Sequence, residues 1–304
     1  MAREPLTLKA YAKVNLTLEV IGKRDDGYHN VATVMQTVDL ADTLVISQAA
    51  QLEVECDEPS LLGESNLAWK AAVALASRVG AVPRGRIHIE KGIPVASGLG
   101  GGSADAAAAL LGLNRLWGLK LGMAELAEIA AGLGSDVPFL LNGGTAMGTG
   151  RGDEIAPLPA LPATEVLLVV PADSIDVKTP TMYRALRPGD FSDGSRTRRI
   201  ASRSGGQALT SEDCCNAFER AAREIFSGLG SVWDSVAAVT RYPPRLSGAG
   251  PTLYTMPSSE TERIRVAESL QGTDATAYLV RTISPEDRPR AASINQVQPT
   301  INQV

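Results

Sequence analysis

The sequence predicts an α+β fold in two domains, and three observations lead to this prediction. Residues 6–20 alternate between apolar and mostly polar side chains, as in a β-strand. Helical segments then follow strands, and a proline-rich segment at 156–163 precedes a new apolar strand. Because 304 residues suffice for two cores, we expect domains over 1–158 and 159–285 and a flexible tail over 286–304.

The alternation at the start of the chain predicts a half-buried strand. Side chains alternate along a strand, so the face opposite the core carries Tyr11, Lys13, Asn15 and Thr17. The following elements are a turn at 25–29, strands over 31–40 and 42–47, a helix over 66–79, a strand over 86–95, and helices near 103–117 and 123–133. Gly134 ends the last of these helices, and Pro138 prevents its resumption.

The second half predicts another α+β mixture. It opens with the strand EVLLVVP at 165–171 and continues with helices near 179–187, 212–229 and 259–271 and strands near 252–256 and 276–282. The polar segment 190–206 holds four arginines and one aromatic residue. A nucleic-acid surface would interleave more aromatic residues with its charges, so we expect a solvated, flexible loop there.

Composition excludes several classes of protein. With 44% apolar residues, 21% charged residues and a net charge of -5, the chain resembles neither a disordered protein nor a nucleic-acid binder. No apolar run reaches the length of a membrane span, and the N-terminal residues lack the apolar core of a signal peptide. We therefore expect a cytoplasmic protein without nucleic-acid or membrane partners.

Glycines cluster directly before a helix in the segment PVASGLGGGSADAA, which begins at residue 94. The backbone at Gly98 and Gly100 to Gly102 can approach a ligand closely, and the first helical turn leaves N–H groups unpaired. Those amides and the helix dipole favour an anion, so the segment predicts a phosphate site. It is neither a Walker A motif nor a dinucleotide fingerprint. The alternative is a glycine-rich turn capped by Ser103.

Three segments together carry a resemblance that none carries alone. They are AYAKVNL with GKRDDGYH near the start, the glycine-rich segment, and LSGAGPTLY at 246–254, supported by GLGSDVPF at 132–139 and KTPTMY at 178–183. The set resembles the GHMP kinase superfamily, whose members phosphorylate small alcohols with ATP. GKRDDGYH is similar to the branch whose alcohol is a methylerythritol linked to cytidine diphosphate. The resemblance runs from about residue 6 to residue 284.

The resemblance implies a fold and an activity. It implies an N-terminal ribosomal-protein-S5-like domain, a C-terminal ferredoxin-like α/β sandwich and an active site in the cleft between them. The implied reaction is ATP-dependent phosphorylation of the 2-hydroxyl of the CDP-methylerythritol substrate in the non-mevalonate route to isoprenoids, with Mg²⁺, by a monomer or homodimer. The alternatives are another superfamily kinase, acting on homoserine, mevalonate or a sugar, and a nucleotide-binding module without catalysis.

The matching motifs also imply residue roles. Asp136 would accept or orient the proton of the acceptor hydroxyl, and Lys13 would stabilise that carboxylate and the developing charge. Tyr28 and Tyr183 would sandwich the cytosine, whose edge His29 would contact. Nucleotide-binding residues would be Asn66, Lys91, Pro94, Gly98, Leu99, Gly100, Gly101, Gly102 and Ser103, with Ser103 also a metal contact. Substrate-binding residues would be Lys13, Asn15, Tyr28, His29, Asp136, Thr179, Tyr183, Gly248 and Gly250.

Local sequence leaves a structural alternative for most of these residues. Asp136 also suits a turn or a helix cap, and Lys13 a solvated position on a strand. Asn66 also suits a helix N-cap. Two residues depart from the family pattern: Ala104 and Ala249 stand where hydroxyl-bearing residues are common.

Overall fold

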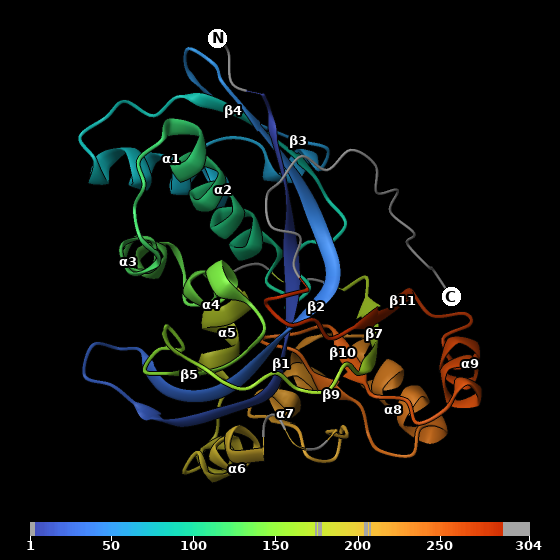
Figure 1. The fold of residues 1–304 in the computed structure, drawn as a ribbon. Coiled ribbons are helices and arrows are strands. Elements are labelled where there is room, and N and C mark those ends of the chain that lie inside the picture. Colours follow the sequence, from blue (N-terminus) through green and yellow to red (C-terminus); the bar gives the residue numbers. More distant parts are fainter. Residues whose placement is uncertain (1–3, 174, 176–177, 204–205, 207, 288–304) are drawn as a thin grey trace.

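The computed structural model describes residues 4–173, 175, 178–203, 206 and 208–287, and it contains a seven-stranded and a four-stranded sheet covered by helices (Figure 1). The predicted α+β class is confirmed. From residue 288 onward, the predicted tail lies outside the described residues.

The first sheet is organised around two long antiparallel strands. Its main path runs in the order β3-β4-β2-β1-β8, while β5 pairs with β2 and β6 pairs with β5. The strands are β1 (Leu6–Lys23), β2 (His29–Ser47), β3 (Leu52–Cys56), β4 (Gly85–Glu90), β5 (Thr145–Thr149), β6 (Glu154–Pro157) and β8 (Cys215–Asn216). The two strands predicted over 31–40 and 42–47 are thus one continuous strand, β2, because it pairs with β1 along most of its length. Sequence reasoning did not predict β3, β5 and β6.

The prediction that β1 is half-buried is wrong for its central part. Residues 12–20 are buried on both faces, and Lys13 is only 3% exposed. Two segments remote in sequence pack against the strand: the Lys13 amide donates to the carbonyl of Leu99, and the Tyr254 hydroxyl donates to the carbonyl of Asn15 at 3.0 Å. The polar residues Lys13, Asn15, Thr17 and Glu19 of β1 therefore lie inside the molecule.

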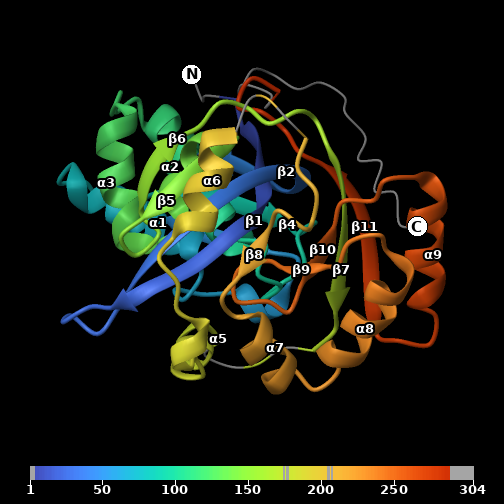
Figure 2. The ribbon, with the colours of Figure 1, turned by 90° about the horizontal axis from the view of Figure 1, so that it is seen from below.

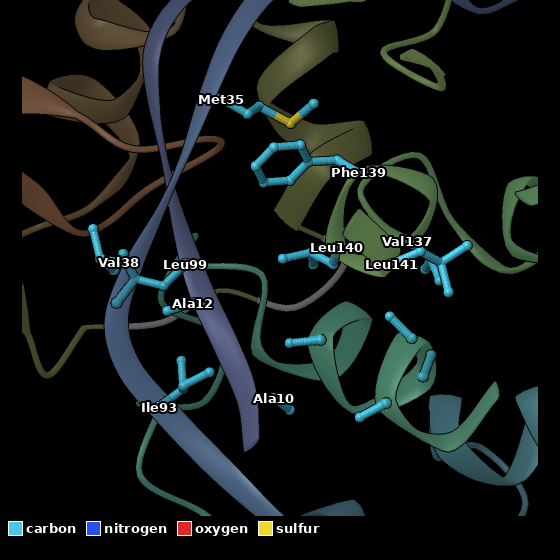
Figure 3. Packing of buried hydrophobic residues seen from close by; sticks show 14 of the residues in the cluster. Ala10, Ala12, Met35, Val38, Ile93, Leu99, Val137, Phe139, Leu140 and Leu141 are labelled. Carbon is cyan, nitrogen blue, oxygen red and sulfur yellow. The ribbon is translucent and has the colours of Figure 1, made fainter. Parts of the chain in front are cut away.

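Helices cover one face of the first sheet (Figure 1). They are α1 (Leu67–Arg78), α2 (Gly101–Trp117), α3 (Met123–Leu133) and α4 (Val137–Asn142). Figure 3 shows side chains from β1, β2 and α4 in the core that these elements share, together with Leu99 of the glycine-rich segment. In the described part of the chain, no helix is long and apolar enough to cross a membrane.

Pro138 begins a helix instead of preventing one. It lies in the first turn of α4, where a proline loses no helical hydrogen bond because the first N–H groups have no intrahelical partner. Gly134 does end α3 as expected. The short connection between the two helices carries Asp136 at the position before α4, and its side chain makes no capping bond there.

The second sheet runs in the order β11-β7-β10-β9. Its strands are β7 (Glu165–Pro171), β9 (Arg245–Leu246), β10 (Leu253–Thr255) and β11 (Ala275–Arg281), and the accompanying helices are α5 (Lys178–Arg184), α7 (Glu219–Ile225), α8 (Leu229–Val239) and α9 (Glu260–Ser269). The single helix predicted over 212–229 is wrong, since α7 starts later and α8 follows as a separate helix.

The expectation of a flexible loop over 190–206 is also wrong. Residues Ser195–Arg203 form α6, which packs across β1, β2 and β5 (Figure 2). Two buried residues fix it: Ile200 enters the first core, and the amide of Thr197 donates to the buried carboxylate of Glu19 at 2.7 Å. The sequence did not predict this helix, because exposed arginines dominate its composition. Only every third residue faces the sheet.

The two cores share strand β1. Val14 and Leu16 belong to the first core, whereas Leu18 and Val20 belong to the second, which lies between the second sheet and helices α7 to α9. Elements from beyond residue 158 also join the first sheet, since β8 pairs with β1 in parallel. The division of the chain near residue 158 stays a prediction.

Candidate active site

A cleft with a volume of about 1120 Å³ collects most of the residues that the sequence singles out. The predicted residues that line it are Lys13, Asn15, Tyr28, His29, Lys91, Pro94, Gly98, Gly100, Gly101, Gly102, Ser103, Asp136, Thr179, Tyr183 and Gly248. Three predicted residues, Asn66, Leu99 and Gly250, are not part of the lining. Leu99 is fully buried in the first core, so it can contribute only its backbone.

Lys13 and Asp136 form an ion pair in the cleft. The Lys13 Nζ lies 3.1 Å from the Asp136 Oδ2, and the side chains are 3% and 33% exposed respectively. The lysine comes from the middle of β1, and the aspartate from the connection between α3 and α4. The carboxylate is thus open to a ligand on one side and held by a buried ammonium on the other.

A chain of hydrogen bonds fixes the position of Lys13. Its Nζ donates to Asn15 Oδ1 at 2.6 Å, the Asn15 amide donates to the Thr33 hydroxyl at 2.9 Å, and that hydroxyl donates to the carbonyl of Thr17. All of these groups are buried between β1 and β2. A buried ammonium needs such partners, because leaving one unpaired in the interior is costly.

The glycine-rich segment brings the start of α2 against Lys13. Gly100 is the residue before the helix, with a φ of 77°, and no side chain caps the helix there. A Cβ on Gly100 would lie 3.1 Å from carbon atoms of the Lys13 side chain. The first amides of α2, from Gly101 to Ser103, have no carbonyl partner in the preceding turn and line the cleft. This arrangement suits an anion.

The segment 246–250 completes this end of the cleft. Its Ser247 hydroxyl donates to the carbonyl of Gly98 at 3.1 Å. Gly248 has a φ of 56°, and a Cβ there would lie 3.2 Å from the Lys13 Nζ. Both glycine-bearing segments therefore need small residues, because their backbones close on each other and on the lysine.

Aromatic side chains line the other end of the cleft. The rings of His29 and Tyr183 are stacked with centroids 4.6 Å apart, and Phe218 meets Tyr183 edge-on at 4.9 Å. Tyr28 is 56% exposed, and the guanidinium of Arg151 lies 5.0 Å from its ring centre. Burial, aided by the nearby Asp136 charge, raises the pKa of Tyr183 to about 12. His29 therefore covers a face of Tyr183, one of the two tyrosines expected to sandwich the cytosine.

Asn66 and Lys91, the predicted adenine-side residues, are held by the protein. Asn66 is the N-cap of α1, where its side chain accepts the amide of Ala68 and donates to the carbonyl of Leu61. The Lys91 ammonium lies between the carboxylates of Asp42 and Asp105. Burial and the neighbouring Asp42 raise the pKa of Asp105 to about 7.

Sequence reasoning missed several lining residues. Those with polar or aromatic groups are Lys23, Thr33, Ser97, Ser135, Arg151, Lys178, Arg184, Phe191 and Phe218. Lys178 could have been predicted, because it stands directly before Thr179 in the segment KTPTMY. Phe191 could not have been predicted, because it lies in the polar segment 190–206 that was expected to be a loop.

Comparisons with solved structures place the fold among small-molecule kinases. The mevalonate kinase of Methanococcus jannaschii superposes with a TM-score of 0.67 at 13% identity, over 92% of this chain and 98% of its own. The model for the GHMP kinases N terminal domain matches residues 66–144, which include the glycine-rich segment and Asp136. The fold is therefore that of the GHMP kinases, and the matched domain includes part of the site.

Closer relatives narrow the class. The 4-diphosphocytidyl-2-C-methyl-D-erythritol kinase of Dehalococcoides mccartyi is 40% identical over 283 residues, covering 93% of this chain and all of the relative. The enzyme of that name from Moorella thermoacetica is 39% identical over 285 residues, covering 91% and 99%. A crystal structure of a 4-(cytidine 5'-diphospho)-2C-methyl-D-erythritol kinase superposes with a TM-score of 0.73 at 33% identity, covering 91% and 100%. The chain belongs to the 4-diphosphocytidyl-2-C-methyl-D-erythritol kinase family, which confirms the resemblance.

Proposed function

We propose that this protein transfers the γ-phosphoryl group of ATP to the 2-hydroxyl of 4-diphosphocytidyl-2-C-methyl-D-erythritol, a step of non-mevalonate isoprenoid synthesis. Membership of a kinase family implies the use of ATP. The observation that carries the proposal is the Lys13–Asp136 pair, which shares a cleft with the uncapped N-terminus of α2. The same cleft holds an aromatic cluster, which consists of Tyr28, His29, Tyr183 and Phe218. Relatives that cover nearly the whole chain bear the name of this reaction.

The site offers a group for each part of the reaction. The acceptor oxygen forms a bond to the γ-phosphorus, the bond from that phosphorus to the bridging oxygen breaks with its electron pair going to ADP, and the hydroxyl proton goes to Asp136. Lys13 stabilises the aspartate before transfer and the negative charge during it. The amides at the start of α2 hold the phosphates in place.

The residues present also fit Mg²⁺, with few ligands from the protein. In the residues that the structure describes, no group of three or more His, Cys, Asp or Glu side chains is placed to hold a metal ion. Magnesium commonly keeps several waters and binds phosphate oxygens, and we propose the Ser103 hydroxyl, at the cleft wall, as its contact with the protein. The ion would neutralise charge on the triphosphate.

The aromatic cluster is proposed to bind the cytosine. A flat base stacks on aromatic rings with little dependence on its own orientation, and each stacked base contributes about 1–3 kcal/mol. Tyr183 packs against the edge-on ring of Phe218, whereas Tyr28 is exposed. Because His29 lies on Tyr183, a base between the two tyrosines requires the His29 ring to move to the base edge.

Replacing Tyr183 with leucine is expected to raise KM for the cytidine substrate about tenfold or more, since the stacking surface is lost. KM for ATP stays within about twofold, because the phosphate end of the cleft is untouched. Steady-state kinetics with each substrate varied in turn measure both values. Tyr183→Phe, which keeps the ring, retains wild-type values. Tyr242→Leu is the matched control, because Tyr242 lies outside the cleft; an unchanged KM in Tyr183→Leu would contradict the assignment.

The direct test is an assay of ADP release with MgATP and one alcohol at a time. The alcohols are 4-diphosphocytidyl-2-C-methyl-D-erythritol, homoserine, mevalonate and galactose, with product masses measured. Turnover with the cytidine compound alone supports the proposal. Turnover with a different alcohol refutes the substrate assignment, and a folded, ATP-binding protein that is inert with all four refutes the catalytic one.

A further inference from the structure

Lys178 lines the phosphate end of the cleft, and the reaction described above gives it no role. It is the first residue of α5, and its Nζ donates to the carbonyl of Ala96 at 2.5 Å and to that of Gly250 at 2.7 Å. Ala96 precedes the glycines of the nucleotide segment, and Gly250 belongs to the segment that closes on Lys13. The ammonium thus bridges two segments that form the reacting end of the site.

The hydrogen-bond count of Lys178 leaves a donor for a ligand. An ammonium has three N–H groups, and within the part of the chain that the structure describes two of them are donated, to the carbonyls of Ala96 and Gly250. Lys178 also lines the cleft, so the remaining N–H has access to a bound molecule. Two carbonyl bonds hold the nitrogen in place before any ligand arrives, which is the property of a preorganised charge.

The balance of charge around Lys178 favours an anion. The titratable groups that act on it are Lys13 of β1 and Asp136 before α4, and Asp136 is already bound by Lys13. Among the described residues no carboxylate lies within ion-pair distance of Lys178. Burial and the nearby Lys13 charge lower the pKa of Lys178 to about 8. An anion with several negative oxygens would supply the missing counter-charge.

We propose that Lys178 is a further catalytic residue, which donates its third N–H to an oxygen of the phosphoryl group while that group moves from ADP to the acceptor. Lys178 keeps its proton throughout: the bond from phosphorus to the ADP oxygen breaks, the bond to the acceptor oxygen forms, and the acceptor proton goes to Asp136. The inference rests on the proposed phosphoryl transfer but not on the identity of the alcohol. Lys178 stabilises the negative charge on the phosphoryl oxygens, and this stabilisation is strongest during transfer.

The test compares Lys178→Met, Lys178→Arg and the wild type, with Lys70→Met on the exposed surface of α1 as a charge-matched control. Lys178→Met is expected to lower kcat about 100-fold or more, while KM for each substrate changes by less than about threefold. The wild-type kcat/KM, which reports ionisations of the free enzyme, falls as the pH rises through about 8, because only the ammonium donates. Lys178→Arg keeps part of the activity, and its alkaline decline moves to higher pH, since a guanidinium stays charged.

A binding measurement separates catalysis from a structural bridge. With Mg²⁺ and calorimetry, Lys178→Met is expected to bind ADP as the wild type does and to bind ADP with aluminium fluoride, a mimic of the phosphoryl group in transfer, at least about tenfold more weakly. Equal weakening for both ligands, or a kcat within about threefold of wild type, would overturn the proposal. If the wild type does not phosphorylate the cytidine substrate, the proposed function fails, and the fluoride measurement still tests Lys178 alone.

Discussion

Asp136→Asn is expected to lower kcat by a factor of about 100 to 10,000, the range that a positioned general base contributes. Asparagine has the same shape but cannot take the acceptor proton, and it removes the charge paired with Lys13. KM for both substrates should change little, because the side chain still fills its place between α3 and α4. Single-turnover and steady-state measurements of ADP release give kcat and KM.

Asp274→Asn is the matched control for this change, since Asp274 is exposed, precedes β11 and lies outside the cleft. It is expected to leave kcat unaltered. The asparagine at 136 should spare the fold, because the Asp136 side chain makes no capping bond to α4 and Lys13 keeps its bond to Asn15. A folded Asp136→Asn protein with wild-type kcat would remove Asp136 from the mechanism.

Gly98→Ala is expected to lower the free energy of unfolding by about 3 kcal/mol or more and to abolish measurable MgATP binding. The residue has a φ of 90°, and a Cβ there would lie 2.5 Å from the carbonyl oxygen of Ser247 and 2.8 Å from that of Gly250. The left-handed conformation costs an alanine about 1–3 kcal/mol, and the overlap with backbone adds a similar amount. Relief requires the two glycine-bearing segments to separate, which displaces the phosphate site. Urea unfolding and calorimetric titration with MgATP measure the two effects.

Gly132→Ala is the matched control for Gly98→Ala, and we expect it to be stabilising. Gly132 lies within α3, and a Cβ there meets nothing within 4 Å. Alanine should stabilise the helix by up to about 1 kcal/mol and leave MgATP binding unaltered. If Gly98→Ala had the same free energy of unfolding and the same affinity for MgATP as Gly132→Ala, the close approach of residues 98 and 247 would be required neither for stability nor for MgATP binding.

The sequence allowed much of the candidate site to be predicted because several of its residues carry local signals. The period of two along β1 placed Lys13 and Asn15 on one face, and that face does line the cleft. Glycines before an alanine-rich helix indicated an anion site wherever the helix lay in the fold. The family motifs then linked these segments to Asp136, which is 123 residues beyond Lys13 and has no periodic signal of its own.

The errors arose where tertiary contacts outweigh local composition. Four arginines favoured a loop over 190–206, but a buried isoleucine and the bond between Thr197 and Glu19 fix a helix there. The middle of β1 is also packed against the segments around Leu99 and Tyr254, which alternation alone does not reveal. Lys178 gains its position from the carbonyls of Ala96 and Gly250, and no spacing in the sequence predicts such contacts.

The sharing of β1 between the two cores has a consequence for how the protein melts. Leu16 and Leu18 are two residues apart, yet each belongs to a different core. Loss of order in one core therefore removes packing from a strand that the other core also needs. β8, from the second half of the chain, adds a further link by pairing with Thr17 and Leu18. Calorimetry should therefore record one cooperative transition, and neither half of the chain, expressed alone, should hold a stable tertiary structure.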